Sequence, residues 1–285
     1  MANDYFSFKR FTVWQRRAAM RVGTDGVLLG AWFDPGGDGA RMLDVGTGTG
    51  VIALMAAQRN PSARIDAVEI DAGSCADAAE NFAGSPWAER LALFGESFAS
   101  FCGHATRKYD RIVSNPPYFV GSLKCPDPGR TRARHTDSLP HPELLAGAAG
   151  LLTEKGCLSV VLPADGADAF TGQAARYGLF PARTLAVCPV PGTVPKRMLI
   201  EFRTFRGGRR NGSAGDCAGR RNGLYGPVPG ADRRFLSENV SVFRNIVYFC
   251  SYRFGENSEL KTIDYEKSVG FRCVVRPGNG GFGTG

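Results

Sequence analysis

The chain has 285 residues and 43% of them are hydrophobic, which suits one large α/β domain, or two small ones, with a buried core. No apolar run approaches the roughly 18 residues that cross a bilayer, and the amino end lacks the apolar block of a signal peptide. We therefore expect a cytoplasmic protein with no membrane partner. The eight cysteines include no C-x-x-C pair, which favours reduced thiols over a disulfide framework and predicts no metal site.

Positive charge and glycine are concentrated in residues 206–285. The chain carries 35 Lys and Arg against 27 Asp and Glu, a net charge of +8. This last segment holds 13 of the basic residues, 7 of the acidic ones and 15 of the 37 glycines. We expect an amino-terminal segment at 1–40, a domain at 41–205 and an irregular, basic, Gly- and Arg-rich tail at 206–285.

Apolar runs of strand length alternate with helical stretches between residues 41 and 202. Strands are predicted at 41–46, 65–70, 91–95, 109–115 and 157–163, and the segment 180–202 can supply two more. Helices are predicted at 50–59, 72–84 and 141–156. Near-continuous apolar strands separated by helices are typical of a doubly wound α/β fold, here with a mostly parallel, seven-stranded sheet. Ligands in this class bind outside the carboxyl ends of the strands.

The stretch LDVGTGTG follows the first predicted strand and opens a helix. Its glycines let the backbone approach a ligand closely, and the helix amino terminus favours an anion such as a carboxylate. The spacing G-x-G-x-G departs from the dinucleotide fingerprint G-x-G-x-x-G, so a nicotinamide enzyme fits poorly. Glu69 ends the second strand, 25 residues after Asp44, and suits hydrogen bonding to both hydroxyls of a ribose. A structural turn followed by an ordinary surface acid is the alternative.

This strand, loop and helix resemble motif I of the S-adenosylmethionine-dependent class I methyltransferases. The resemblance implies S-adenosyl-L-methionine as cofactor, with the loop at its methionine part and Glu69 at its ribose. In GESF, Glu96 and Ser97 would lie near the adenine, and which of the two makes the hydrogen bond stays open. The cofactor-binding residues expected from these segments are Asp44, Gly46, Thr47, Gly48, Gly50, Glu69, Ile70, Glu96 and Ser97.

The stretch SNPPYF follows the fourth predicted strand, and its NPPY resembles motif IV of amino methyltransferases. Two adjacent prolines fix the backbone and leave its carbonyl groups unpaired. An exocyclic amine is a poor nucleophile because its lone pair is delocalised into the ring. If Asn115 Oδ1 and the Pro116 carbonyl oxygen accept hydrogen bonds from the two N–H groups of the amine, its lone pair turns toward a sulfonium methyl group. Tyr118 can then stack on the base. The expected catalytic residues are therefore Asn115, Pro116, Pro117 and Tyr118; a plain turn is the alternative.

NPPY alone leaves the methyl acceptor open among adenine in DNA or RNA, guanine in ribosomal RNA and glutamine in a protein. The flanking stretches FSFKRFTVWQRRAAMRVGTDGVLLGAW, SPWAERL and ARHTDSLPHPELL, with SNPPYF, together resemble the bacterial tRNA1(Val) (adenine(37)-N6)-methyltransferase family. The resemblance covers residues 6 to about 204. It implies methylation of N6 of adenine 37 in the anticodon loop of a valine tRNA, and it places Thr24 and Asp25 at the cofactor pocket. A base in a single-stranded loop costs less to flip out than one in a duplex.

Two basic segments are expected to contact the tRNA. In residues 1–40, which would form an RNA-binding or cofactor-covering lid, basic residues alternate with aromatic ones that could stack on bases; the alternative is that Phe11 and Trp14 simply pack on the domain. The loop after NPPY either grips RNA phosphates or is merely solvated. The expected nucleic-acid contacts are Lys9, Arg10, Arg16, Arg17, Lys124, Arg130, Arg132 and Arg134. We expect a monomer.

The tail departs from the family pattern after MLIEFRTF. Family members usually finish with a stretch resembling Tyr-Thr-x-x-Tyr/Phe-x-x-Leu-Thr-x-x-Phe-Tyr-Leu, which this chain lacks. Residues 224–238 can be translated back into codons of our choice that the genetic code permits. When that nucleotide sequence is read in the frame that starts one nucleotide later, it encodes fourteen residues that match this ending. We interpret the tail as a frame-shifted readout; a genuine basic RNA-binding extension is the alternative, and sequencing the encoding DNA separates the two. If the tail is damaged, a cofactor- or RNA-binding protein without turnover becomes the alternative function.

Overall fold

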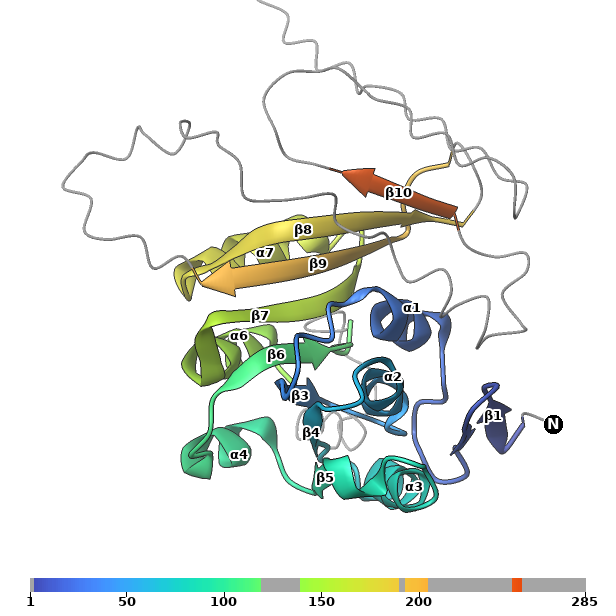
Figure 1. Ribbon diagram of the computed structural model, residues 1–285. Coiled ribbons are helices and arrows are strands. Elements are labelled where there is room, and N and C mark those ends of the chain that lie inside the picture. Colours follow the sequence, from blue (N-terminus) through green and yellow to red (C-terminus); the bar gives the residue numbers. More distant parts are fainter. Residues whose placement is uncertain (1–2, 119–138, 190–192, 205–247, 253–285) are drawn as a thin grey trace, which may run out of the picture.

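A single eight-stranded sheet organises the protein in the computed structural model, which describes residues 3–118, 139–189, 193–204 and 248–252 (Figure 1). The strands lie in the order β10-β8-β9-β7-β6-β3-β4-β5. Their bounds are β3 Arg41–Val45, β4 Arg64–Val68, β5 Leu91–Phe94, β6 Tyr109–Ser114, β7 Leu152–Pro163, β8 Leu179–Cys188, β9 Arg197–Thr204 and β10 Tyr248–Tyr252. β5, β4, β3, β6 and β7 are parallel, while β9 is antiparallel to both β7 and β8.

The strand order reverses between β3 and β6. From β3 the chain proceeds outward through β4 to β5, and it then returns to form β6 and β7 on the other side of β3. In the parallel pair, Val45 at the end of β3 lies beside Ser114 at the end of β6, and the Ser114 hydroxyl donates to the Val45 carbonyl oxygen (2.8 Å). The segments that follow these two strands therefore emerge side by side, at the point where α/β sheets bind ligands.

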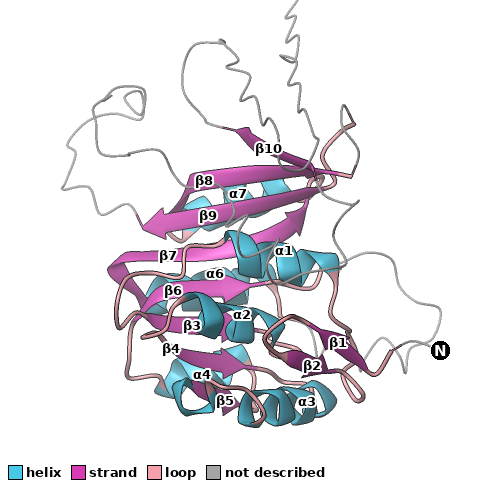
Figure 2. Cartoon of the chain, turned by 45° about the vertical axis from the view of Figure 1, so that its right-hand side comes forward, coloured by secondary structure: helices cyan, strands magenta, loops and turns pink. Residues whose placement is uncertain are grey.

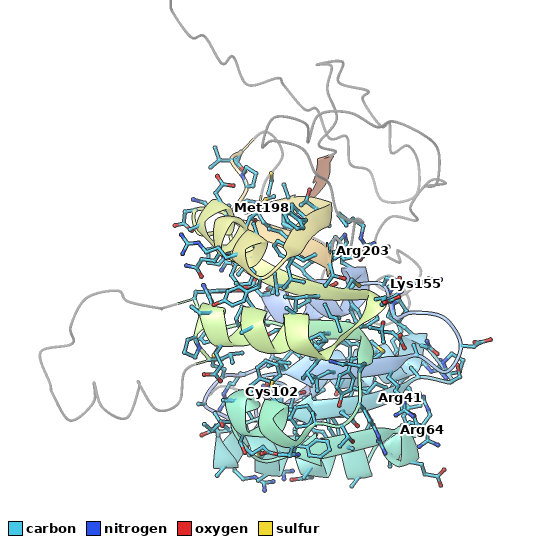
Figure 3. The ribbon with its side chains drawn as sticks, turned by 90° about the vertical axis from the view of Figure 1, so that its left-hand side faces the viewer. Arg41, Arg64, Cys102, Lys155, Met198 and Arg203 are labelled. Carbon is cyan, nitrogen blue, oxygen red and sulfur yellow. The ribbon has the colours of Figure 1, made fainter. Side chains whose placement is uncertain are left out.

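Helices cover both faces of the sheet (Figure 2). Residues of α1, α2 and α3 pack in one apolar cluster, and residues of α4, α6 and α7 pack in the other, on the face that Figure 3 views. The bounds are α1 Thr24–Trp32, α2 Val51–Arg59, α3 Ala72–Ala83, α4 Phe98–His104, α6 His141–Leu151 and α7 Ala167–Arg176, with a short 3-10 helix at Ala88–Arg90. None of the described helices has the length and apolar character needed to span a membrane.

The predicted doubly wound fold, with seven mostly parallel strands between residues 41 and 205, is confirmed. Two details differ. The helix predicted at 141–156 ends at Leu151, because the chain already pairs with β6 at Leu152; the register then shifts before Cys157 pairs with Arg111. In addition, β10 pairs antiparallel with β8 and covers what would otherwise be the sheet edge, so this part of the expected irregular tail is a strand. The rest of the tail lies outside the described residues.

The amino-terminal segment packs against the domain. β1 (Tyr5–Ser7) and β2 (Thr12–Trp14) form an antiparallel hairpin. Phe8 and Phe11 stack on each other with ring centroids 4.4 Å apart, and both rings belong to the core. Phe11 therefore packs on the domain, as the alternative for Phe11 and Trp14 held, and neither Phe8 nor Phe11 is available to stack on RNA bases. Trp14 is only half-buried, so the structure does not decide between the two interpretations for its ring.

Asn81, a buried residue of α3, ties this hairpin to the loop between β3 and α2. Its side-chain amide donates to the carbonyl oxygens of Trp14 (2.8 Å) and Thr49 (2.9 Å), and its Oδ1 accepts from the backbone N–H of Trp14 (2.7 Å). One side chain thus serves three backbone groups on two segments that are far apart in the sequence.

Replacing Asn81 with alanine is expected to lower the free energy of unfolding by about 3 kcal/mol, because buried backbone groups would lose their partners. Urea denaturation of the full chain measures this loss. Glu80→Ala on the same helix is the control: it removes exposed ion pairs with Arg16 and Arg17, and it should cost no more than about 1 kcal/mol. Equal losses in the two variants would contradict the role given to Asn81.

Candidate active site

A glycine loop, residues 46–50, follows β3 and leads into α2. Gly46, Gly48 and Gly50 have φ values of 70°, 57° and 82°, in the left-handed region that other residues adopt only with strain. A Cβ atom at Gly46 or Gly48 would meet no atom within 4 Å, whereas one at Gly50 would lie 2.5 Å from the Phe82 ring. Gly50 is thus required by internal packing, while Gly46 and Gly48 border open space in which a ligand can approach the backbone.

Asp44, in β3, hydrogen-bonds to the glycine loop and to α2. Its Oδ2 accepts hydrogen bonds from the Thr47 hydroxyl (2.6 Å) and from the backbone N–H of Ala53 in α2 (3.1 Å). Its Oδ1 is buried and has no hydrogen-bond partner among the residues that the structure describes. The pKa of Asp44 is raised to about 7, chiefly by burial and to a lesser degree by the nearby Glu69 carboxylate, against the opposing effect of the two hydrogen bonds.

This raised pKa predicts that the ligand-free protein loses stability as pH rises. Between the ordinary carboxyl pKa near 4 and the folded value of about 7, the folded state holds a proton on Asp44 that the unfolded state has released. The free energy of unfolding should therefore fall across this window, by about 4 kcal/mol at most, and stay level above it. Urea denaturation at several pH values measures the slope, which Asp44→Asn should flatten. An unchanged slope in that variant would contradict the assignment.

Glu69 directly follows β4 and faces the glycine loop. Its Oε2 accepts from the Gly48 N–H (2.8 Å), and its Oε1 accepts from the N–H groups of Ile70 and Asp71 (2.9 Å each). These bonds fix the carboxylate, and its oxygens retain lone pairs for further donors such as ribose hydroxyls. The adjacent Ile70 is 44% exposed, so its apolar side chain can contact a flat ring.

Glu96 and Ser97 follow β5, and both make local contacts with α4. The Ser97 hydroxyl accepts from the backbone N–H of Ser100 and caps the helix (3.1 Å). Glu96 accepts from the Ser100 hydroxyl (2.5 Å) and pairs with His104 (2.9 Å). The Ser100 hydrogen bond, followed by that of His104, lowers the pKa of the Glu96 carboxyl. These contacts do not single out either residue as the partner of a ligand.

The NPPY motif, residues 115–118, follows β6 and lies next to the amino end of α1. The Tyr118 hydroxyl lies 3.0 Å from Asn115 Oδ1 and 2.7 Å from Asp25 Oδ2. Arg197, at the start of β9, donates through Nε to the same Asp25 oxygen (2.8 Å), and its guanidinium carbon lies 5.2 Å from the centre of the Tyr118 ring. Asp25 therefore contacts the NPPY motif. Arg197 also belongs to this site, although it was not among the site residues predicted from the sequence.

The residues expected to contact RNA have different surroundings. Arg17 pairs with the buried Asp77 (Nε to Oδ1, 2.9 Å) and with Glu80. Arg16 pairs with Glu80 (3.1 Å), and its guanidinium carbon lies 3.9 Å from the centre of the Trp14 ring. These two arginines therefore have acidic partners on α3. Lys9 and Arg10 are exposed between β1 and β2, and Lys124, Arg130, Arg132 and Arg134 lie outside the described residues.

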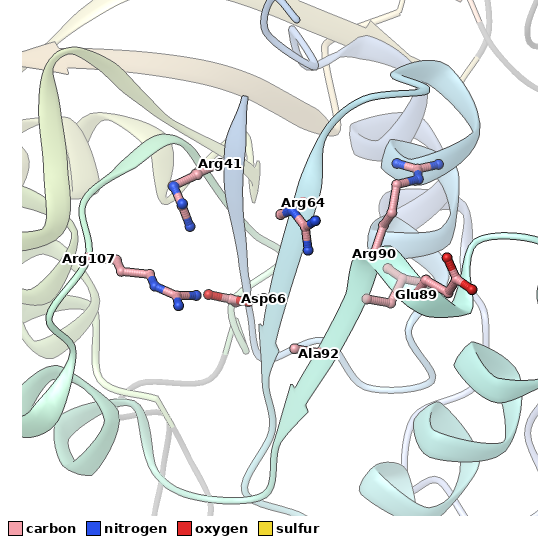
Figure 4. Close-up of a pocket in the computed structure, with 8 residues that line it drawn as sticks. Arg41, Arg64, Asp66, Glu89, Arg90, Ala92 and Arg107 are labelled. Carbon is pink, nitrogen blue, oxygen red and sulfur yellow. The ribbon is translucent and has the colours of Figure 1, made fainter. Parts of the chain in front are cut away.

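A cavity of about 130 Å³ lies at the opposite end of the strands from the candidate active site, near the amino ends of β3, β4 and β5 (Figure 4). Its lining is mostly charged: Arg41, Arg64, Asp66, Glu89, Arg90, Leu91, Ala92 and Arg107. The Arg90 guanidinium donates to the carbonyl oxygens of Asn60, Ala63 and Ala57. No residue of the glycine loop or of the NPPY motif lines this cavity, so it is separate from the candidate active site.

A reversal of strand order between β3 and β6, with a glycine loop after one strand and NPPY after the other, defines a class I methyltransferase. The methyltransferase small domain family matches residues 27–165. The tRNA1(Val) (adenine(37)-N6)-methyltransferases of Bacteroides fragilis and Bacteroides thetaiotaomicron are each 51% identical over 203 residues, which is 71% of this chain and 85% and 84% of theirs. The enzyme of that name from an Enterobacter species is 39% identical over 249 residues, 87% of this chain and 96% of its own. The chain belongs to the tRNA1(Val) (adenine(37)-N6)-methyltransferase family, as its sequence motifs predicted.

Proposed function

We propose that this methyltransferase transfers a methyl group from S-adenosyl-L-methionine to N6 of adenine 37 in the anticodon loop of tRNA1(Val). The observation that carries the proposal is the pairing of Val45 with Ser114, since it sets the glycine loop and Asn115 side by side at the ends of neighbouring strands. A cofactor bound at the glycine loop and a target amine bound at Asn115 would then lie next to each other. Relatives about half identical in sequence bear the name of this activity.

The residues of the glycine loop fit this cofactor. Gly46 and Gly48 leave room for a ligand against the backbone, and Glu69 offers a fixed carboxylate for two ribose hydroxyls. The exposed Ile70 side chain suits the adenine ring, with Glu96 or Ser97 at its edge. Thr24 and Asp25 border the other side of the pocket, where Asp25 Oδ2 accepts from Tyr118 and Arg197. S-Adenosylmethionine supplies the electrophilic methyl group.

The NPPY motif prepares the target amine. Asn115 Oδ1 and the Pro116 carbonyl oxygen accept hydrogen bonds from its two N–H groups, which turns the nitrogen lone pair toward the methyl group and holds the two reactants in line. Tyr118 stacks on the base that has been flipped out of the anticodon loop. The methylated, positively charged nitrogen then loses its extra proton to water, so the site requires no general base.

The proposed RNA partner is the valine isoacceptor, bound by a monomer in the cytoplasm, where tRNA is modified. Lys9 and Arg10 between β1 and β2, and the basic residues from 124 to 134, would neutralise RNA phosphates. Arg16 and Arg17 remain candidates, although each of them shares its charge with an acidic residue of α3.

The test is to incubate the purified full chain with S-adenosylmethionine and tRNA from cells that lack this modification, followed by nucleoside analysis of each isoacceptor. N6-methyladenosine next to the valine anticodon supports the proposal. Methylation of ribosomal RNA, DNA or a protein glutamine instead would identify another acceptor of the NPPY enzymes. Cofactor binding without transfer to any acceptor would indicate a binding protein, and it would direct attention to residues 206–285.

A further inference from the structure

The Tyr118 hydroxyl has one proton and two acceptors. It lies 2.7 Å from Asp25 Oδ2 and 3.0 Å from Asn115 Oδ1. Burial, followed by the hydrogen bond to Asp25, raises the pKa of Tyr118 against the opposing effect of Arg197, so the hydroxyl keeps its proton at neutral pH. The two oxygens therefore compete for a single donor.

Asp25 is the stronger acceptor of the two. A hydrogen bond to a carboxylate is shorter and roughly twice as strong as one to a neutral amide, in agreement with the two distances. Arg197 donates to the same Asp25 oxygen (2.8 Å) and so fixes the carboxylate beside the hydroxyl. The Asp25 side chain is 20% exposed, so water competes little for this oxygen.

The competition matters because Asn115 Oδ1 is the atom on which the proposed reaction depends. An oxygen that already accepts from Tyr118 is a weaker acceptor for the target amine, since the tyrosine proton occupies one of its lone pairs. If Asp25 were absent, the hydroxyl would turn fully to Asn115. The catalytic oxygen would then keep only one lone pair for the target amine and would be a weaker acceptor for it.

We propose that Asp25, held in place by Arg197, draws the Tyr118 proton away from Asn115 Oδ1 and thereby keeps that oxygen open to the target amine. Asp25 and Arg197 are positioning residues in this account, acting on substrate through Tyr118 and Asn115. The inference rests on the proposed methyl transfer to an exocyclic amine. It assigns Asp25 a task other than contact with the cofactor.

A double-mutant cycle tests the inference in the full chain. Asp25→Ala should lower kcat by about tenfold or more, and Asp25→Asn by less, because an amide still shares the proton. In a Tyr118→Phe background, where no hydroxyl proton exists, the same two changes should alter kcat by less than about twofold. Calorimetry on each variant should give an S-adenosylmethionine affinity within about twofold of the original chain. Asp34→Ala is the matched control, since it removes another Asp–Arg pair, with Arg111 in the first half of β6, whereas Tyr118 follows the carboxyl end of that strand.

Losses that multiply in the double variants, or a cofactor affinity that falls with Asp25 whether or not Tyr118 is present, would overturn the inference. The second result would identify Asp25 as a direct cofactor ligand. If Asp25→Ala does not fold, the near-isosteric Asp25→Asn carries the test alone. If the original chain methylates no amine, the proposed function fails together with the inference, whereas multiplicative losses in an active enzyme refute only the inference.

Discussion

Replacement of Asn115 by alanine will lower kcat for tRNA methylation by about 10²–10³-fold, because the target amine loses an acceptor that orients its lone pair in the transition state. Asn115 is half-buried at the end of β6, and its only described side-chain partner is the Tyr118 hydroxyl. The change should therefore leave the melting temperature and the affinity for S-adenosylmethionine nearly unaltered. Single-turnover kinetics with saturating cofactor and tRNA measure the chemical step directly.

The control for this variant is Asn115→Asp, which retains an acceptor oxygen of the same size. It should recover part of the rate, although its negative charge also attracts the Tyr118 and amine hydrogens. If the alanine variant transfers methyl groups at more than about a tenth of the original rate, Asn115 is not the orienting acceptor and the account of the NPPY motif is wrong.

Placing a methyl group on Gly48 will weaken S-adenosylmethionine binding by about 50-fold or more, a loss of more than 2 kcal/mol. In Gly48→Ala the new Cβ enters the open space beside the loop, which we assign to the cofactor. Because the backbone at position 48 is left-handed, the alanine must also adopt that conformation, which lowers the free energy of unfolding by about 1 to 2 kcal/mol. Isothermal titration calorimetry and urea denaturation separate the two effects.

Gly39 provides a matched control for this prediction. Its φ is +68°, close to the +57° of Gly48, and a Cβ there would likewise meet no atom within 4 Å. It precedes β3, at the opposite end of the strand from the glycine loop. Gly39→Ala should lose the same stability and bind the cofactor normally. Equal cofactor affinities in the two variants would show that the space beside Gly48 is not a binding site.

The glycine loop and NPPY could be identified from the sequence because each is a short, continuous segment whose residues act through their own backbone geometry. Positive φ at Gly46 and Gly48, and a rigid turn after a strand, require particular residue types at fixed spacing. The alternation of strands and helices likewise predicted the sheet, since it depends on local periodicity. These features can therefore be predicted without knowledge of tertiary contacts.

Contacts between distant segments could not be predicted in the same way. Arg197 reaches Asp25 across 172 positions, and this depends on β9 running antiparallel beside β7. The pairing of Arg17 with Asp77 requires the amino-terminal segment to lie along α3, which no local pattern indicates. For Arg197, the sequence indicated only that it belongs to the segment 180–202, which was predicted to supply the last two strands. β10 did carry a signal, the β-prone run YFCSY at 248–252, within a tail whose composition suggested no structure.

The most direct test of the central claim compares two transcripts of tRNA1(Val) that differ only at position 37. The full chain is incubated with methyl-labelled S-adenosylmethionine and either the transcript with adenine at this position or one with guanine. We predict stoichiometric labelling of the first, recovered as N6-methyladenosine, and background labelling of the second. Equal labelling of both transcripts, or none of either while another acceptor is methylated, would contradict the proposed function.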